Sequence, residues 1–93
     1  MEVGFVSLRP EKVGDFKAWM ATLQRRREEV FETFRAEGTR HELVAIIENT
    51  DPPVVVYAME AEDLARAQEV FTHSQLSIDV EHKTVLNLSL IHI

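Results

Sequence analysis

The chain has 93 residues, a formal net charge of −6 and no cysteine. This length fits one domain, and so small a domain buries only about 60 to 65% of the surface of its unfolded chain, so we expect a homodimer. The acidic balance argues against a nucleic-acid partner, and the lack of cysteine excludes disulfides, a thiolate nucleophile and a cysteine-zinc site. The chain start lacks a signal-peptide pattern and no apolar run approaches the ~18 residues of a membrane span, so we expect a cytoplasmic protein without a membrane partner.

The first predicted elements are a strand and a long helix. Val3 to Arg9 is short, rich in branched and aromatic residues, and stopped by Pro10, which is typical of a strand. From Pro10 to Glu37 apolar residues recur at helical spacing, which predicts an amphipathic helix that ends before Gly38. The apolar stripe consists of Val13, Phe16, Met20, Leu23, Val30 and Phe34. A straight helix would be about 40 Å long at ~1.5 Å per residue, more than a small sheet needs, so we expect a kink near Gln24 to Arg27.

The middle of the chain predicts a β-hairpin. Two β-rich runs, Arg40 to Asn49 and Val54 to Glu60, flank the proline-rich turn Thr50 to Pro53. Their centres, Leu43 to Ile47 and Val54 to Tyr57, are continuously apolar, which is typical of strands buried on both faces. The helices of so small a chain can cover only one face of a sheet. We therefore expect a second subunit to pack against the other face.

The C-terminal third predicts a helix and an ambiguous tail. Ala61 to Ser74 has helical periodicity, and Ser77 or Asp79 can cap a further short helix. Val85 to Ile93 fits either a continued helix or a last strand. The order strand, helix, strand, strand, helix indicates an α+β fold with an antiparallel sheet, and it matches the split βαβ, ferredoxin-like plan if the tail supplies the fourth strand.

Several segments together resemble a known family. These are VSLRPEKVGDFKAWM, RRREEVFETFRAEG, HELV, YAMEAEDLARAQEVF and SQLSIDVEH. They resemble small bacterial proteins of unknown function that are assigned to the dimeric α+β barrel group of ferredoxin-like folds, over Val3 to about Val85. The resemblance implies a dimeric barrel. Relatives in the wider group include monooxygenases of the antibiotic-biosynthesis type, haem-handling enzymes, isomerases and ligand binders, so function stays open.

The last six residues depart from this resemblance. Leu88 to Ile93, LSLIHI, resembles the translation of a common sequencing adapter. Two interpretations follow for the single α+β domain 1–93: either 88–93 is a non-native tail and the fourth strand is truncated, or the segment is a natural apolar edge strand. We assign no role to His92.

Three residues are candidates for proton transfer. Asp79 and His82 lie three positions apart, so on a helix they share a face, and a carboxylate can orient an imidazole or raise its pKa. Alternatively, Asp79 only caps a helix and His82 lies on the surface. Glu42 lies on the same strand face as Val44 and Ile46, where an apolar environment raises the pKa of a carboxyl; Glu48 shares this face near the hairpin end, where solvent reaches it.

Three further residues are candidates for ligand binding. Arg27 occupies a position in the apolar stripe. Either the helix bends there and the side chain reaches solvent, or it faces a pocket as an anion clamp or pairs with an inward carboxylate such as Glu42. Tyr57 lies on the opposite strand face from Val56, where its hydroxyl can enter a pocket or the dimer interface. Trp19 lies beside the stripe and suits core or interface packing as well as stacking on a ligand.

The signal for a metal is weak. His41, Glu42, Asp79 and His82 could form a two-histidine, two-carboxylate site, but no short-range ligand motif such as HExxH is present. His73 suits the C-terminal end of a helix through its charge alone. We therefore assign no metal and name no cofactor.

These candidates lead to an expectation of a dimeric protein that handles a small molecule. One hypothesis is a cofactor-free enzyme that uses Asp79 and His82 as an acid-base pair, with Glu42 or Arg27 holding the substrate. The alternatives are a ligand-binding homodimer without catalysis and a purely structural homodimer. No motif identifies the ligand.

Overall fold

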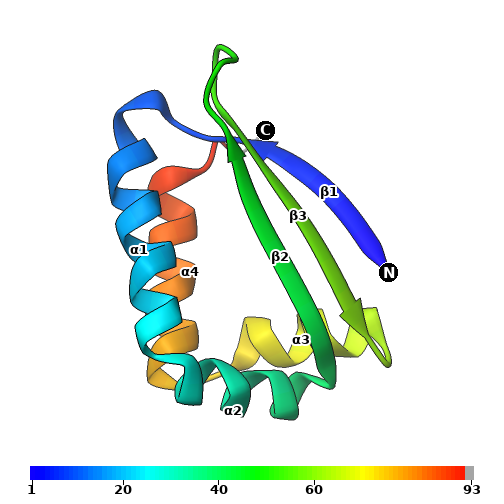
Figure 1. Cartoon of the computed structure of the whole chain (residues 1–93). Helices are drawn as coiled ribbons and strands as arrows, with labels where there is room; N and C mark the ends of the chain where they lie inside the picture. The colour runs from blue at the N-terminus through cyan, green and yellow to red at the C-terminus, as the bar shows by residue number, and fades with distance from the viewer. Residues whose placement is uncertain (92–93) are drawn as a thin grey trace.

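The structure, a computed structural model, describes residues 1–91 as three strands, four α-helices and one 3-10 turn (Figure 1). In chain order these are β1 (Glu2–Ser7), η1 (Pro10–Lys12), α1 (Val13–Arg25), α2 (Arg27–Glu37), β2 (Thr39–Ile47), β3 (Val54–Ala61), α3 (Leu64–His73) and α4 (Ser77–Ser89). The fold is therefore α+β, as the element order predicts. Within the described residues, no helix has both the length and the apolar character needed to cross a membrane.

The sheet is antiparallel, with the strand order β1-β3-β2. The predicted hairpin is confirmed: β2 pairs with β3 from Ile47↔Val54 to Thr39↔Ala61, with a register shift between Thr39 and His41. β1 pairs with the other edge of β3. The central strand, β3, is thus the last of the three described strands in sequence, and it pairs with both edge strands of the sheet.

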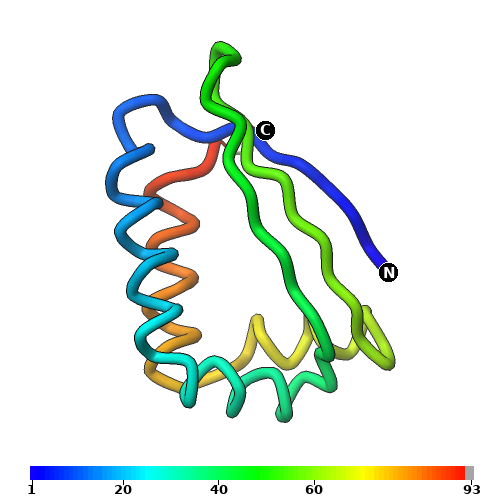
Figure 2. The backbone as a smooth tube through the Cα atoms, viewed as in Figure 1, coloured from blue at the N-terminus to red at the C-terminus, as the bar shows by residue number. Residues whose placement is uncertain are grey.

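The predicted kink in the long helix is confirmed at Arg26. This residue has φ −103° and ψ 35°, and its N–H bonds to the carbonyls of both Thr22 and Leu23. α1 runs beside α4 along the length of the sheet, whereas α2 and α3 lie together across one end of the molecule (Figures 1 and 2). Gly38, with φ 76°, ends α2 in the left-handed conformation and lets the chain enter β2.

Two predicted boundaries near the third and fourth helices are wrong. β3 continues through Ala61, and α3 begins only after Asp63, whose carboxylate accepts a hydrogen bond from the Arg66 N–H at 3.1 Å. α4 has Leu76 at its N-cap, so neither Ser77 nor Asp79 caps it. Of the two alternatives for the tail, the structure shows the helix as far as Ser89, where α4 ends. His92 lies outside the described residues.

The hydrophobic core lies at the hairpin end of the sheet. It is formed by Leu8, Phe16, Val55 and Leu90, which join the inner face of the sheet to α1 and to the end of α4. Val6, Val44 and Ile46 pack against this cluster from the same face. The opposite end of the inner face carries polar residues, among them Glu42.

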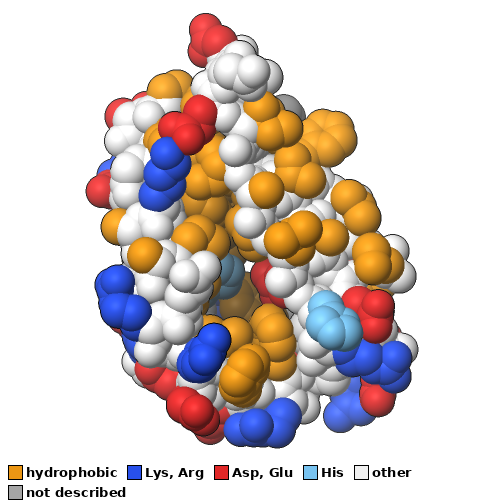
Figure 3. Space-filling view, viewed as in Figure 1, with side chains coloured by type: hydrophobic (Ala, Val, Ile, Leu, Met, Phe, Trp, Pro, Cys, Tyr) orange, Lys and Arg blue, Asp and Glu red, His pale blue; other side chains and the backbone are white. Residues whose placement is uncertain are grey.

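The outer face of the sheet is apolar and open to solvent. Val3, Phe5 and Leu43 are 65%, 78% and 67% exposed. The strand pairing aligns them with Val56 and Ala58 of the central strand, and Figure 3 shows hydrophobic side chains gathered over the strands. The helices of the single chain cover only the inner face, as expected, and a second subunit on the outer face stays a prediction.

Candidate functional site

A hollow separates the polar end of the inner sheet face from the helices (Figure 3). A groove of about 420 Å³ opens between α2 and the start of β2. Phe31, Phe34 and Arg35 line it from the helix, and His41 and Glu42 line it from the strand. Glu42 thus belongs both to this groove and to the face of the sheet that the helices cover.

Glu42 points inward because of the sheet register. It pairs with Met59 and lies two residues before Val44, which packs against the core from the same face. Glu42 is exposed to solvent as a residue, but the many protein atoms around its carboxylate partly bury that group. This burial raises the pKa of Glu42, and the nearby charge of Glu37 raises it further.

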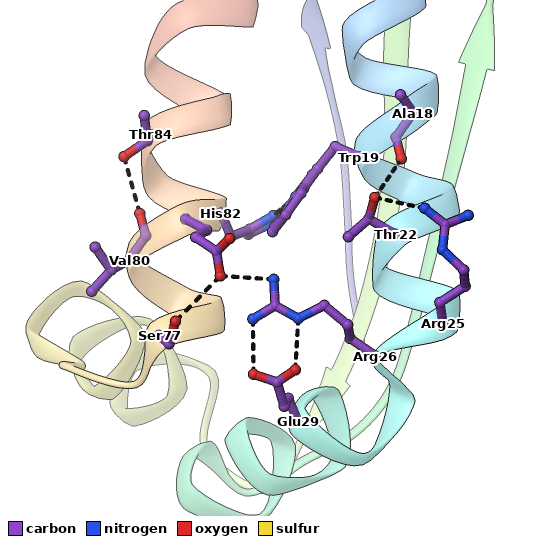
Figure 4. A network of polar contacts seen from close by, with 11 residues as sticks. Ala18, Trp19, Thr22, Arg25, Arg26, Glu29, Ser77, Val80, His82 and Thr84 are labelled. Carbon is purple, nitrogen blue, oxygen red and sulfur yellow. Dashed lines mark hydrogen bonds and ion pairs between the residues drawn. The ribbon is translucent and has the colours of Figure 1, made fainter.

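His82 lies among aromatic side chains from two other helices. The indole N–H of Trp19 on α1 donates to Nδ1 of His82 at 2.6 Å, and the two rings stack with centroids 5.9 Å apart (Figure 4). Phe71 of α3 meets the imidazole edge to face at 5.6 Å. Burial lowers the pKa of His82, and the charge of Asp79 opposes this shift. The imidazole is therefore neutral at pH 7.

Asp79 takes part in a separate buried system. It is the third residue of α4 and only 3% exposed, and its carboxylate accepts a hydrogen bond from the Thr33 hydroxyl at 2.6 Å. The same hydroxyl lies 3.3 Å from the Glu37 carboxylate, which also accepts from Thr39 at 3.0 Å. Among the described residues, no hydrogen bond joins Asp79 to His82. The predicted acid-base pair thus interacts through charge only.

Within this buried system, Glu37 favours its protonated form. Burial raises its pKa most and the charge of Asp79 adds to the rise, while the hydrogen bonds from Thr39 and Thr33 oppose it. Thr33 has a single hydroxyl proton and cannot donate it fully to two carboxylates. A proton on Glu37 removes this conflict, since its O–H can then donate to Thr33.

The sequence-based predictions missed this buried system, although a signal for it was present. Thr33 and Glu37 lie four residues apart on the face of α2 that also carries Val30 and Phe34. Polar residues on an inward stripe are candidates for a buried polar contact. The partner, Asp79, lies 46 residues further along the chain and is not visible in helical spacing.

Arg27 lies on the surface, at the first position of α2. The helix bends just before it, which matches the interpretation in which the side chain reaches solvent. Its neighbour Arg26 turns inward instead, making a two-pronged contact with Glu29 at 2.6 and 2.8 Å and reaching Glu81 of α4 at 2.7 Å (Figure 4). The arginine that joins the helices is thus one residue earlier than the apolar stripe suggests.

Tyr57 lies on the inner face of the sheet, flat against β1. A Cβ atom added at Gly4 would come within 2.5 Å of the Tyr57 hydroxyl oxygen, so the glycine makes room for the ring. Gly4 and Val44 are its neighbours across the two edges of β3. Of the predicted ligand-binding residues, Tyr57 faces the helix side and Trp19 contacts His82, whereas Arg27 points away.

The residues of the possible metal site do not come together. His41 lies 3.7 Å from Glu60 on the outer side of the sheet, and Asp79 is buried beside Thr33. In residues 1–91, no group of three or more histidine, aspartate or glutamate side chains is placed to hold a metal ion. Glu48 forms an exposed ion pair with Lys17 at 2.6 Å, and His73 is exposed at the end of α3.

Comparison with known proteins identifies the family. A family model described as "Family of unknown function (DUF6176)" matches residues 1–90. The chain belongs to this family. No curated protein and no solved structure gives a significant match. Membership of DUF6176 therefore assigns no role to Glu42 or His82.

Proposed function

We propose that this DUF6176 protein is a homodimer that binds and transforms a small molecule in the hollow between the inner sheet face and the helices. One arrangement carries the proposal: Glu42 lines the groove from the inner face of the sheet, and His82 lies on the interior side of α4, so the two groups bring complementary chemistry. Glu42 is a carboxyl group whose pKa is raised by burial, and His82 is a neutral imidazole held between aromatic rings. Apolar walls with a few convergent polar groups are characteristic of small-molecule sites.

In this proposal Glu42 transfers the proton. A carboxyl group whose pKa is raised toward neutrality is a better general base than an ordinary glutamate, because its carboxylate binds a proton more tightly. Asp79 acts on His82 only through its charge. The reaction needs no cofactor, since proton transfer is within the reach of these side chains. A ligand-binding protein without catalysis is the alternative, because the same groups give affinity without turnover.

The proposal includes the dimeric α+β barrel form of the ferredoxin-like fold. The strand order β1-β3-β2 is the one that the split βαβ plan produces. Leu90 bridges Leu8 in antiparallel fashion, and the N–H of Ile91 donates to the carbonyl of Ser7 at 2.9 Å. The chain after α4 therefore runs against the free edge of β1, where the fourth strand of this plan begins. The open apolar face then packs against a second copy.

A thermal-shift screen of the purified protein tests this proposal. The panel contains divalent metals, haem, flavins, and small organic acids and carbonyl compounds, each measured with the wild type, Glu42→Gln and His82→Phe. We expect at least one compound to stabilise the wild type and to lose its effect in His82→Phe. Glu48→Gln is the matched control, because Glu48 lies on the same strand face but pairs with Lys17 in solvent.

Turnover then separates the two functions. In an enzyme, Glu42→Gln abolishes conversion of the stabilising compound while binding persists; in a binding protein, the wild type does not convert the compound at all. If no compound stabilises the wild type, or if both site variants respond like the wild type, the hollow is not the site and the structural homodimer is the better interpretation.

A further inference from the structure

The hydrogen bond from Trp19 determines which nitrogen of His82 carries a proton. An indole N–H can only donate, so Nδ1 of His82, 2.6 Å from it, has to present a lone pair. A neutral imidazole has a single N–H, which is then on Nε2. Adding a second proton at Nδ1 would place two N–H groups against each other and break the contact with Trp19. The structure thus holds the ring as one neutral tautomer.

The Nε2–H group of His82 is open to water. Within residues 1–91, no protein atom accepts a hydrogen bond from Nε2, and no buried side-chain nitrogen or oxygen lacks a partner, so water reaches Nε2. His82 lies four residues after Ile78 and four before Leu86, on the side of α4 that faces the molecule's interior. Nε2 is therefore a water-accessible atom on the interior side of α4.

We propose that Trp19 is a positioning residue that makes His82 a fixed N–H donor, and that the hollow binds a ligand through a carbonyl or carboxylate oxygen. This rests on the proposed function, because it names the ligand group that the same site takes. His82 is then not the base, since neither nitrogen has a free lone pair. A donor held in place without rearrangement suits an oxygen that gains negative charge.

The two polar groups together define a substrate class, namely carbonyl compounds with an acidic C–H next to the carbonyl. In the reaction the C–H bond breaks and its proton passes to the Glu42 carboxylate. The electron pair moves toward the carbonyl, forming a C=C bond and an enolate oxygen. His82 Nε2–H donates to that oxygen. No oxidant or second reactant is needed, and return of the proton to another atom completes an isomerisation.

The tautomer can be measured without any ligand. Long-range ¹H–¹⁵N correlation spectra of the ¹⁵N-labelled full chain report which ring nitrogen is protonated, and comparison with His82→Phe assigns the signals. We expect the pure Nε2–H form of His82 in the wild type at neutral pH. In Trp19→Phe, which keeps an aromatic ring and loses the donor, we expect a mixture of tautomers and a higher pKa for His82. An Nδ1–H form or an imidazolium in the wild type, or spectra unchanged in Trp19→Phe, would overturn the role of Trp19.

A second measurement tests the ligand class. Acetylacetone, which has acceptor oxygens and an acidic C–H, should raise the melting temperature of the wild type and much less that of His82→Phe. Ethylammonium, which can only donate, should have no effect. Equal stabilisation of wild type and His82→Phe, no effect of acetylacetone, or a stronger effect of ethylammonium would overturn the ligand class. The broader proposal fails separately, when every compound of the wider panel is silent or when both site variants respond to the panel like the wild type.

Discussion

Replacing Phe5 with aspartate should break the proposed dimer. Phe5 is 78% exposed and lies in a row with Val56 and Ala45 across the three strands, at the centre of the open face. Burying a phenylalanine side chain contributes about 1.5–3 kcal/mol, and a two-fold interface contains the residue twice, so its loss removes about 3–6 kcal/mol. Since each 1.4 kcal/mol is a factor of ten, the dimer dissociation constant should rise by roughly two to four powers of ten.

Sedimentation equilibrium over a concentration series measures this change directly. The wild type should have twice the 10.7 kDa mass of one chain, and Phe5→Asp should approach the single-chain mass, with circular dichroism confirming that the variant is folded. Val80→Asp is the matched control: Val80 is 44% exposed, but it lies on α4, away from the sheet. A wild type that stays monomeric at high concentration, or equal masses for Phe5→Asp and Val80→Asp, would refute the reasoning.

Two further predictions concern stability. Gly4→Ala should lower the free energy of unfolding by about 1–3 kcal/mol, because the new Cβ overlaps the Tyr57 ring; urea titration measures this, and Gly14→Ala, whose Cβ meets nothing within 4 Å, is the control. Glu37→Gln should stabilise the protein above neutral pH. The raised pKa of Glu37 means that its contribution to stability is complete below the ordinary glutamate pKa of 4.5 and is lost as pH rises through the folded pKa, whereas glutamine does not titrate. The urea midpoints of the wild type and Glu37→Gln, measured from acid to alkaline pH, should therefore diverge as the pH rises. A constant difference would contradict the raised pKa of Glu37.

Much of the fold could be predicted because its signals are local. The apolar stripe, the glycine after Glu37 and the proline-rich turn each act within a few residues, and they placed the helix, its end and the hairpin correctly. The kink followed from a length argument. The direction of α2 after the kink could not be predicted in this way. It depends on how Arg26 bonds to Glu29 in the first turn of α2 and to Glu81 on α4.

The candidate site was predicted in part, for a similar reason. Spacing on one helix suggested Asp79 as the partner of His82, but the ring bonds to Trp19, 63 residues earlier. Asp79 bonds to Thr33 instead, 46 residues earlier. Helical periodicity can show that two side chains share a face. It cannot show which side chain from another helix lies closer, and here the long-range partners decide the chemistry of both groups.

Glu42 shows how distant packing determines the position of a proposed site residue. On β2 an outward Leu43 follows the inward Glu42 directly, so one step of register would exchange them and bury the leucine in place of the carboxylate. Local preference favours that exchange, because leucine belongs inside and glutamate outside. The register is held by Ile46 and Val55, which pair with each other and pack in the core at the far end of the sheet. A single chain therefore leaves Leu43 in water and turns a carboxylate toward its interior, an arrangement that the proposed second subunit on the outer face and the proposed ligand at Glu42 would make favourable.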